Sequence, residues 1–210
     1  MQSMTIESAT QNPVSRSPGR PREFDMDEAL DKAIVVFSER GYHAASISDL
    51  TAAMELTAGS VYKAFKDKRA VFLAAFDRYK TVREGLLMAA IAAAQNGRER
   101  LRLALTFYAE SAHGERGRRG CLVVGSAAEL AIFDTQAADR VAASIARNEK
   151  RFCDFIREGQ ADGSIRADID AVATARLVLC LQQGMSLVGK TGRQRSEMLS
   201  LVDIAMRLFD

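Results

Sequence analysis

Proline occurs only at the start of this chain. Its three prolines, Pro13, Pro18 and Pro21, lie within the first 21 of 210 residues. Because proline fixes φ and lacks a backbone N–H, it breaks helices, and nothing after Pro21 carries this restriction. The remainder is rich in alanine and lacks the period-two alternation of strands. The sequence therefore predicts an all-α fold, and we expect nine helices.

The expected helices follow from apolar spacing, N-cap residues and glycine stops. They span residues 26–41, 46–54, 58–65, 68–95, 97–111, 121–131, 136–162, 169–188 and 194–209. A glycine-rich, basic loop is expected at 113–120. We interpret residues 1–23 as a disordered basic arm, 24–68 as a small DNA-binding domain and 69–210 as a larger helical domain.

Composition limits the classes of protein that the chain can belong to. The net charge is +2, so any affinity for nucleic acid must come from a local patch. No apolar run reaches the length needed to cross a bilayer and no signal peptide is recognisable, so we expect a cytoplasmic protein without a membrane partner. Three scattered cysteines and two histidines predict reduced thiols, with neither a metal site nor a cofactor.

Residues 46–68 predict two short helices joined by a tight turn. Ser46 is a suitable N-cap, and Asp49 three residues later completes a capping box. Thr57 is a second N-cap, before a helix that buries Val61. Two short helices in this arrangement are typical of a helix-turn-helix, whose second helix enters the major groove of double-stranded DNA.

The side chains of this segment divide into two groups by the DNA atoms that they suit. Those expected to contact phosphates are Arg20 and Arg22 of the arm, with a solvated tail as the equal alternative, and Ser46, Ser48, Tyr62, Lys66 and Lys68. Those placed to reach base edges are Thr57, Ala58, Gly59, Ser60 and Lys63. For Lys66 the alternative is a solvated surface charge, and for Arg69 that interpretation is preferred.

The last two expected helices, 169–188 and 194–209, are apolar over more of their circumference than one helix pair can bury. A monomeric bundle core is one explanation. A two-fold interface is better supported, because a helix-turn-helix usually reads paired half-sites as a dimer. We therefore expect a homodimer that forms through these two helices.

The segment GSVYKAFKDKRAVF carries a specific pattern, which is met by Gly59, Ser60, Val61, Tyr62, Phe65 and Lys68. Together with GRPREFD and SISDLT, it resembles the TetR (tetracycline repressor) family of transcriptional regulators over residues 19–79. The segment GCLVVGSAAEL is similar to one subset of that family. The resemblance implies a homodimeric repressor of nearby genes, released from a palindromic operator by an unknown small-molecule inducer. Glu55 departs from the pattern, because the family often has glycine in this turn, where φ > 0 costs a non-glycine roughly 1 kcal/mol.

Two hypotheses describe how the larger domain senses its effector. Cys121 follows a run of arginines at the start of an expected helix, where a lowered thiol pKa favours the reactive thiolate. It is either a sensor of oxidants and electrophiles or a small buried residue, while Cys153 and Cys180 are expected in the core. The other hypothesis is a reversible inducer in an apolar pocket. Its candidate lining residues, each equally suited to an ordinary core, are Met88, Phe107, Tyr108 and Leu122.

Two other classes of function are less well supported. An enzyme is not expected, because the sequence offers no nucleophile–base set, phosphate loop or metal-ligand cluster. A non-regulatory architectural DNA binder remains an alternative, but it has no need of a helical bundle of some 130 residues.

Overall fold

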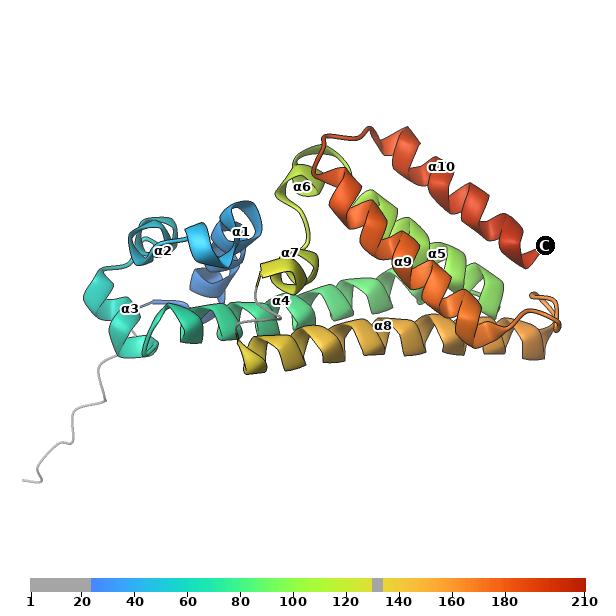
Figure 1. The fold of residues 1–210 in the computed structure, drawn as a ribbon, viewed down its shortest axis with the longest axis horizontal. Helices are drawn as coiled ribbons and strands as arrows, with labels where there is room; N and C mark the ends of the chain where they lie inside the picture. The colour runs from blue at the N-terminus through green and yellow to red at the C-terminus, as the bar shows by residue number, and fades with distance from the viewer. Residues whose placement is uncertain (1–23, 130–133) are drawn as a thin grey trace, which may run out of the picture.

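The computed structural model describes residues 24–129 and 134–210, and in these ranges all regular structure is helical (Figure 1). Arg20 and Arg22 lie outside the described residues. The elements are α1 (Met26–Ala44), α2 (Ile47–Met54), α3 (Ala58–Ala64), α4 (Lys68–Ile91), α5 (Gly97–Glu110), α6 (Gly114–Arg119), α7 (Leu122–Glu129), α8 (Thr135–Asp162), α9 (Ala171–Gly189), α10 (Arg195–Met206) and the 3-10 helix η1 (Arg207–Phe209). The all-α prediction is confirmed, and each of the nine expected helices is present.

The helices α1, α2 and α3 gather at one end of the molecule against the first turns of α4 (Figure 1). Leu50 and Val61 bury the inner faces of α2 and α3, as their spacing predicts. Phe37 of α1 meets Phe72 of α4 edge to face, with ring centroids 5.2 Å apart. These contacts hold the two short helices in a fixed orientation, which neither is long enough to maintain alone.

Two long helices, α4 and α8, run along the molecule and join its two hydrophobic clusters (Figure 1). Phe76 of α4 belongs to the cluster around α1, whereas Leu87 belongs to the cluster formed with α5, α8, α9 and α10. Likewise α8 contributes Val141 to the first cluster and Phe152 to the second. A shift of either helix therefore displaces residues of both clusters.

The contact between α5 and α8 depends on the absence of a side chain at Gly97. A Cβ on Gly97 would lie 2.1 Å from the backbone nitrogen of Gly159 and 2.5 Å from the carbonyl oxygen of Phe155. The Gly97 nitrogen also donates to Asp162 Oδ2 at 2.8 Å. Gly97 therefore fixes how closely the two helices approach each other.

The structure contains one helix where the sequence predicts a loop. Residues 114–119 form α6, in which Gly117 is buried. A Cβ on Gly117 would lie 2.5 Å from the Ala112 carbonyl carbon. Gly120, at φ 88°, ends the helix. The expectation failed because glycine-rich composition favours a loop, whereas here Gly117 permits close packing that sequence spacing does not reveal.

Several helix ends also differ from expectation. Helix α1 reaches Ala44, although Gly41 at φ 77° and ψ 173° interrupts it where a stop is predicted. Helix α4 ends at Ile91, four residues before its expected end, because Ile91 is the last buried residue of its apolar series. Helix α7 ends at Glu129, and the remainder of the helix expected at 121–131 lies outside the described residues.

By length and composition, α9 is apolar enough to cross a membrane, contrary to the expectation that no such run exists. It is the one helix of this kind in the described part of the chain. The core helix of a soluble protein passes the same test, and α9 packs against α8 and α5 through Ala175, Val178 and Met185. Packing within the protomer therefore accounts for part of its composition, while other apolar side chains of α9 stay exposed.

Candidate nucleic-acid interface and ligand pocket

The capping box at the start of α2 is formed as predicted. The Asp49 nitrogen donates to Ser46 Oγ at 3.0 Å, and the Ser46 nitrogen donates to Asp49 Oδ2 at 2.9 Å. The Ser46 hydroxyl also donates to Asp49 Oδ2 at 2.7 Å, so this hydroxyl already has an acceptor. These bonds from Ser46, aided by Arg40, hold the pKa of Asp49 below its usual range. Ser48, two residues after the cap, is exposed.

The turn between α2 and α3 is centred on Glu55, which adopts the left-handed conformation at φ 56° and ψ 37°. It is the one non-glycine residue with positive φ in the described ranges. The Leu56 nitrogen donates to the Thr51 carbonyl at 3.0 Å, so the turn closes α2 as a Schellman motif. The Glu55 carboxylate accepts from Lys32 Nζ at 2.9 Å. The turn thus keeps the geometry that favours glycine, and its carboxylate is neutralised by α1.

Helix α3 presents one buried face and one exposed face. Thr57 caps it, because its Oγ1 accepts from the Ser60 nitrogen at 3.1 Å, and the two hydroxyls lie 3.0 Å apart. Gly59 and Lys63 are exposed, and Tyr62 is 52% exposed although it is aromatic. Ala58 is exposed as well. The structure therefore brings together on one accessible surface every α3 residue predicted to contact DNA.

The two lysines after α3 differ in their surroundings. Lys66 is exposed, and within the described ranges its ammonium has no hydrogen-bond or ion-pair partner. Lys68 Nζ donates at 2.9 Å to the carbonyls of both Tyr42 and Ala45, and it lies 4.5 Å from the centroid of the Tyr42 ring. Lys68 therefore fastens α4 to the end of α1, and two of its three ammonium donors are already used. The sequence did not indicate this structural role.

Arg69 is not a solvated charge, contrary to expectation. Its Nη2 donates to Asp134 Oδ1 at 2.9 Å, and its Nε donates to Oδ2 of the same carboxylate. The hydrogen bond from Arg69 is the main cause of a lowered pKa at Asp134. This fork joins the beginnings of α4 and α8, which are 65 residues apart in sequence.

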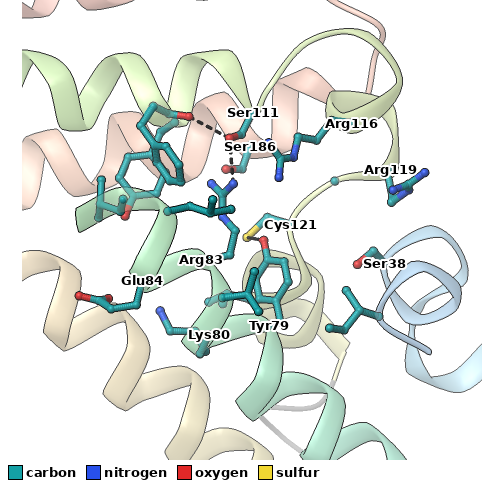
Figure 2. Close-up of a pocket in the computed structure, with 18 of the residues that line it drawn as sticks. Ser38, Tyr79, Lys80, Arg83, Glu84, Ser111, Arg116, Arg119, Cys121 and Ser186 are labelled. Carbon is teal, nitrogen blue, oxygen red and sulfur yellow. Dashed lines mark hydrogen bonds between the residues drawn. The ribbon is translucent and has the colours of Figure 1, made fainter. Parts of the chain in front are cut away.

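A cavity of about 210 Å³ lies among α1, α4, α5, α6, α7, α8 and α9. Figure 2 shows Tyr79, Arg83 and Cys121 pointing into it, with Arg116 and Arg119 on the side of α6. Phe107 and Tyr108 line it as predicted. Met88 and Leu122 do not belong to its lining, so these two predictions are corrected: Met88 is exposed on α4, and Leu122 is buried in the cluster around α1.

Sequence reasoning missed the polar groups of this cavity. Arg83 Nη1 donates to Ser111 Oγ at 3.0 Å, and its guanidinium lies 4.2 Å from the centroid of the Phe107 ring. Gln182 is 2% exposed, and its Oε1 has no hydrogen-bond partner among the described residues. One signal was available, because Tyr79 and Arg83 are four residues apart on an otherwise apolar helix face.

Cys121 is half-buried just before α7, where it forms part of the cavity wall. The Tyr79 hydroxyl donates to Cys121 Sγ at 3.4 Å. Burial, with Cys121 as the next cause, raises the pKa of Tyr79 well above its ordinary value, so the phenol keeps its proton. Cys153 is buried as expected, but Cys180 is exposed on α9 and is not a core residue of the protomer.

Helix α7 also contacts the break in α1. Glu129 Oε2 accepts from the Tyr42 nitrogen at 2.8 Å and from the His43 nitrogen at 3.3 Å. A Cβ on Gly41 would lie 2.0 Å from Glu129 Oε1, so this approach requires glycine. One end of α7 thus contacts the domain that carries α3, while Cys121 and the cavity lie beside its other end.

The expected dimerisation helices correspond to α9 and α10. Six large apolar side chains on α9, α10 and η1 are exposed in the protomer, with exposed fractions from 38% to 60%. They are Val172, Leu177, Leu187, Val188, Ile204 and Leu208.

Comparisons with known proteins agree with this architecture. The profile described as "Bacterial regulatory proteins, tetR family" matches residues 29–75, and "Tetracyclin repressor-like, C-terminal domain" matches residues 97–200. The repressor ComR of Escherichia coli K12 is 28% identical over 200 residues, which cover 93% of this chain and 94% of ComR. DhaR, a repressor of Mycobacterium sp. strain GP1, is 30% identical over 171 residues, which cover 79% of this chain and 82% of DhaR.

Among solved structures, a cysteine-substituted form of the TetR family regulator CifR, complexed with 26-base-pair operator DNA, is 31% identical with a TM-score of 0.81. The match covers 91% of this chain and all of the CifR chain. The helix-turn-helix, the helical second domain and these matches lead to one conclusion: the chain belongs to the TetR family of DNA-binding transcriptional repressors.

Proposed function

We propose that the protein represses genes near its own by binding a palindromic operator as a homodimer, and that a small molecule in the α4–α9 cavity releases it. The observation that carries this proposal is the accessible face of α3. The opposite face of α3 is buried, and α4 connects α3 to a domain that contains a cavity. A purely architectural DNA binder has no use for that cavity.

In the proposed complex α3 enters the major groove. Its N-terminal residues and Lys63 reach base edges, whereas Tyr62 and Lys66 contact phosphates. Ser46 and Ser48 add phosphate contacts at the start of α2. Lys68 has one ammonium donor left for a phosphate, and Arg20 and Arg22 are proposed to reach the DNA from the arm.

The homodimer is proposed to form through α9 and α10. Burying the six exposed apolar side chains against a second copy removes them from water, and a two-fold axis places two α3 helices on one operator. Successive major grooves on one face of DNA are about 34–36 Å apart, so the two reading helices must be separated by this distance to bind. A ligand that changes their separation therefore weakens operator binding.

Two connections are placed to carry that change. One is α4, because its middle lines the cavity and its first turn is fastened by Lys68 to α1. The other is α7, because it begins beside the cavity and its Glu129 contacts the break at Gly41. Helix displacements of 1–2 Å are sufficient for such switching in other proteins.

Gel shifts with an operator selected from random DNA test the assignment of DNA contacts. We expect Tyr62→Phe and Lys66→Ala to weaken binding to matched and scrambled sites equally, because phosphates carry no sequence information. Lys63→Ala should instead change the preferred sequence. Lys150, an exposed lysine of α8, provides the matched control. Unchanged affinity in both phosphate-contact variants refutes the assignment.

A thiol sensor is the second candidate, supported by Cys121 in the cavity wall within hydrogen-bonding distance of Tyr79. In this mechanism the thiolate adds to an electrophilic carbon and the adduct displaces α7. N-ethylmaleimide is a suitable probe, with Cys180→Ser as the matched control, because Cys180 is exposed and also reacts. We expect the reagent to release operator from the wild type and Cys180→Ser but not from Cys121→Ser. Normal release from Cys121→Ser contradicts the sensor hypothesis.

A further inference from the structure

The charged groups of the cavity are unbalanced in favour of positive charge. Five cationic side chains line it: Lys80, Arg83, Arg116, Arg119 and Arg151. Among the described residues, only two carboxylates line it, and both are already paired. Glu84 pairs with Arg151, and Asp31 pairs with Arg78, which lies outside the cavity. Arg119 is paired as well, with Glu39 and Glu115.

The two arginines that remain, Arg83 and Arg116, have no carboxylate within ion-pair distance in residues 24–129 and 134–210. Arg83 donates to the neutral Ser111 hydroxyl and lies over the Phe107 ring. The Arg116 side chain has no hydrogen-bond partner in the same ranges. Both guanidiniums lie at the end of the cavity beside Ser111 and Ser186 (Figure 2).

The charge of Arg83 disfavours the charged form of Arg116. The pKa of Arg116 is lowered, first by desolvation and next by the charge of Arg83. Two unpaired like charges that are partly withdrawn from water are unfavourable unless an anion lies between them. A carboxylate fits, because a guanidinium binds its two oxygens through parallel hydrogen bonds.

A second, independent observation indicates a ligand in the same cavity. The side chain of Gln182 is almost fully buried in the cavity wall, yet its Oε1 has no partner in the described structure. A buried amide oxygen without a partner is unfavourable because it has lost its hydrogen bonds to water, and a hydroxyl or N–H of a bound molecule restores one.

The other walls define the rest of the ligand. They are lined by apolar or aromatic side chains: Ile34 and Val35 of α1, Leu87 of α4, Phe107 and Tyr108 of α5, and Val123 of α7. An apolar cavity of about 150 Å³ holds a benzene molecule, so 210 Å³ suits a single ring or a short alkyl chain with one anionic group.

We propose that this cavity binds a small organic carboxylate, with its anionic group between Arg83 and Arg116 and its apolar part against α1, α5 and α7. This inference rests on the proposed function, in which the cavity holds the releasing ligand. It adds the chemical class of that ligand: a monoanion with a ring or short alkyl chain.

Isothermal titration of the full-length dimer with matched pairs of probes tests the charge requirement. The pairs are benzoate with benzamide, phenylacetate with phenylacetamide, and hexanoate with hexanamide. We expect at least one carboxylate to bind about tenfold or more tightly than its amide, since hydrogen bonds between two charged groups are roughly twice as strong as neutral ones. Inorganic phosphate should bind more weakly than that carboxylate, because it gains nothing from the apolar walls.

The variant Arg116→Met tests the position of the anionic group. Arg116 is exposed at the cavity rim, so this substitution is compatible with folding. We expect it to lower the affinity for the best carboxylate about tenfold and to leave the affinity for the amide unchanged. Arg118→Met is the matched control, because Arg118 lies on the same helix but does not line the cavity.

Three results overturn the proposal: no carboxylate binds better than its amide, phosphate binds as well as the best carboxylate, or Arg116→Met and Arg118→Met behave alike. Operator binding by the ligand-free protein, measured by gel shift, separates this proposal from the proposed function. Retained operator binding without carboxylate preference refutes the ligand class alone, whereas absent operator binding refutes the proposed function itself.

Discussion

The substitution Lys68→Met separates two roles that this residue can have. Sequence reasoning places Lys68 among the phosphate contacts, whereas in the structure its ammonium donates to the carbonyls of Tyr42 and Ala45. Methionine keeps most of the apolar stem and removes the charge with both hydrogen bonds. If the structural contact dominates, the variant loses stability; if a phosphate contact dominates, it loses DNA affinity.

The expected loss of stability follows from these contacts. Hydrogen bonds to a charged group contribute about 1.5–3 kcal/mol each, and the lower end applies because Lys68 is only half-buried. The cation–π contact with Tyr42 adds about 0.5–1 kcal/mol. Methionine does not have to withdraw a charged ammonium from water on folding, and this gain offsets part of the lost stability. We therefore expect a net loss of about 2–4 kcal/mol, or roughly 4–16 °C in Tm for a chain of this size.

Urea unfolding at one fixed protein concentration measures the stability change, because the Tm of a dimer depends on concentration. The salt dependence of operator binding measures the phosphate contact, since each contact contributes about 0.9 to the slope of log K against log salt concentration. We expect Lys68→Met to lower stability and to reduce the slope less than Lys66→Met does, because two of the three Lys68 donors are already used within the protein. Lys66→Met should reduce the slope with unchanged stability. A Lys68→Met protein of wild-type stability with a reduced slope refutes the reasoning.

Three further sets of substitutions test packing, charge and the contact of α7 with α1. Gly97→Ala should destabilise the protein by about 3 kcal/mol or more in urea unfolding, because its Cβ meets the backbone of α8, whereas Gly85→Ala, at an open position of α4, should stabilise it by about 0.5–1 kcal/mol. The pKa of Asp134 is lowered in the folded state by Arg69, so this carboxylate stabilises the protein above pH about 3.9 and the effect is lost as pH falls through the lowered pKa. The difference in stability between wild type and Asp134→Asn, followed by urea unfolding from pH 7 to pH 2, should therefore shrink towards zero, and a constant difference contradicts this. Glu129→Ala should lower Tm by leaving two backbone N–H groups without an acceptor, and Glu129→Gln should restore most of it; equal Tm values for the two variants argue against the contact.

Local features of the fold were predictable because their causes are local. The caps at Ser46 and Thr57 depend on residues three positions away, and the buried face of α3 follows from the spacing of Val61 and Phe65. Glu55 was identified as the unusual residue of the turn for a reason that the backbone confirms, its positive φ. The surface of α2 and α3 was therefore described from sequence more completely than any other part.

Features that depend on distant residues were not predictable. The pairing of Arg69 with Asp134 and the contact of Lys68 with Tyr42 join segments that sequence spacing does not relate. Leu122 was correctly interpreted as apolar, but periodicity does not say which of two hydrophobic clusters a residue enters. Cys180 illustrates the same limit, because an apolar helix face that stays exposed in the protomer has the same sequence pattern as a face in the core.

The sharing of α4 between two hydrophobic clusters restricts how the DNA-binding part can be exchanged between related regulators. A chimera joined inside α4 takes the first turns of this helix from one regulator and the later turns from another. The α4 surface then no longer matches the helices that pack against it in the two clusters. Junctions in the segment between Ile91 and Gly97 keep α4 whole, but they transfer Tyr79 and Arg83 of the cavity together with the reading helix. In this architecture, an exchange of operator specificity therefore also changes part of the ligand site.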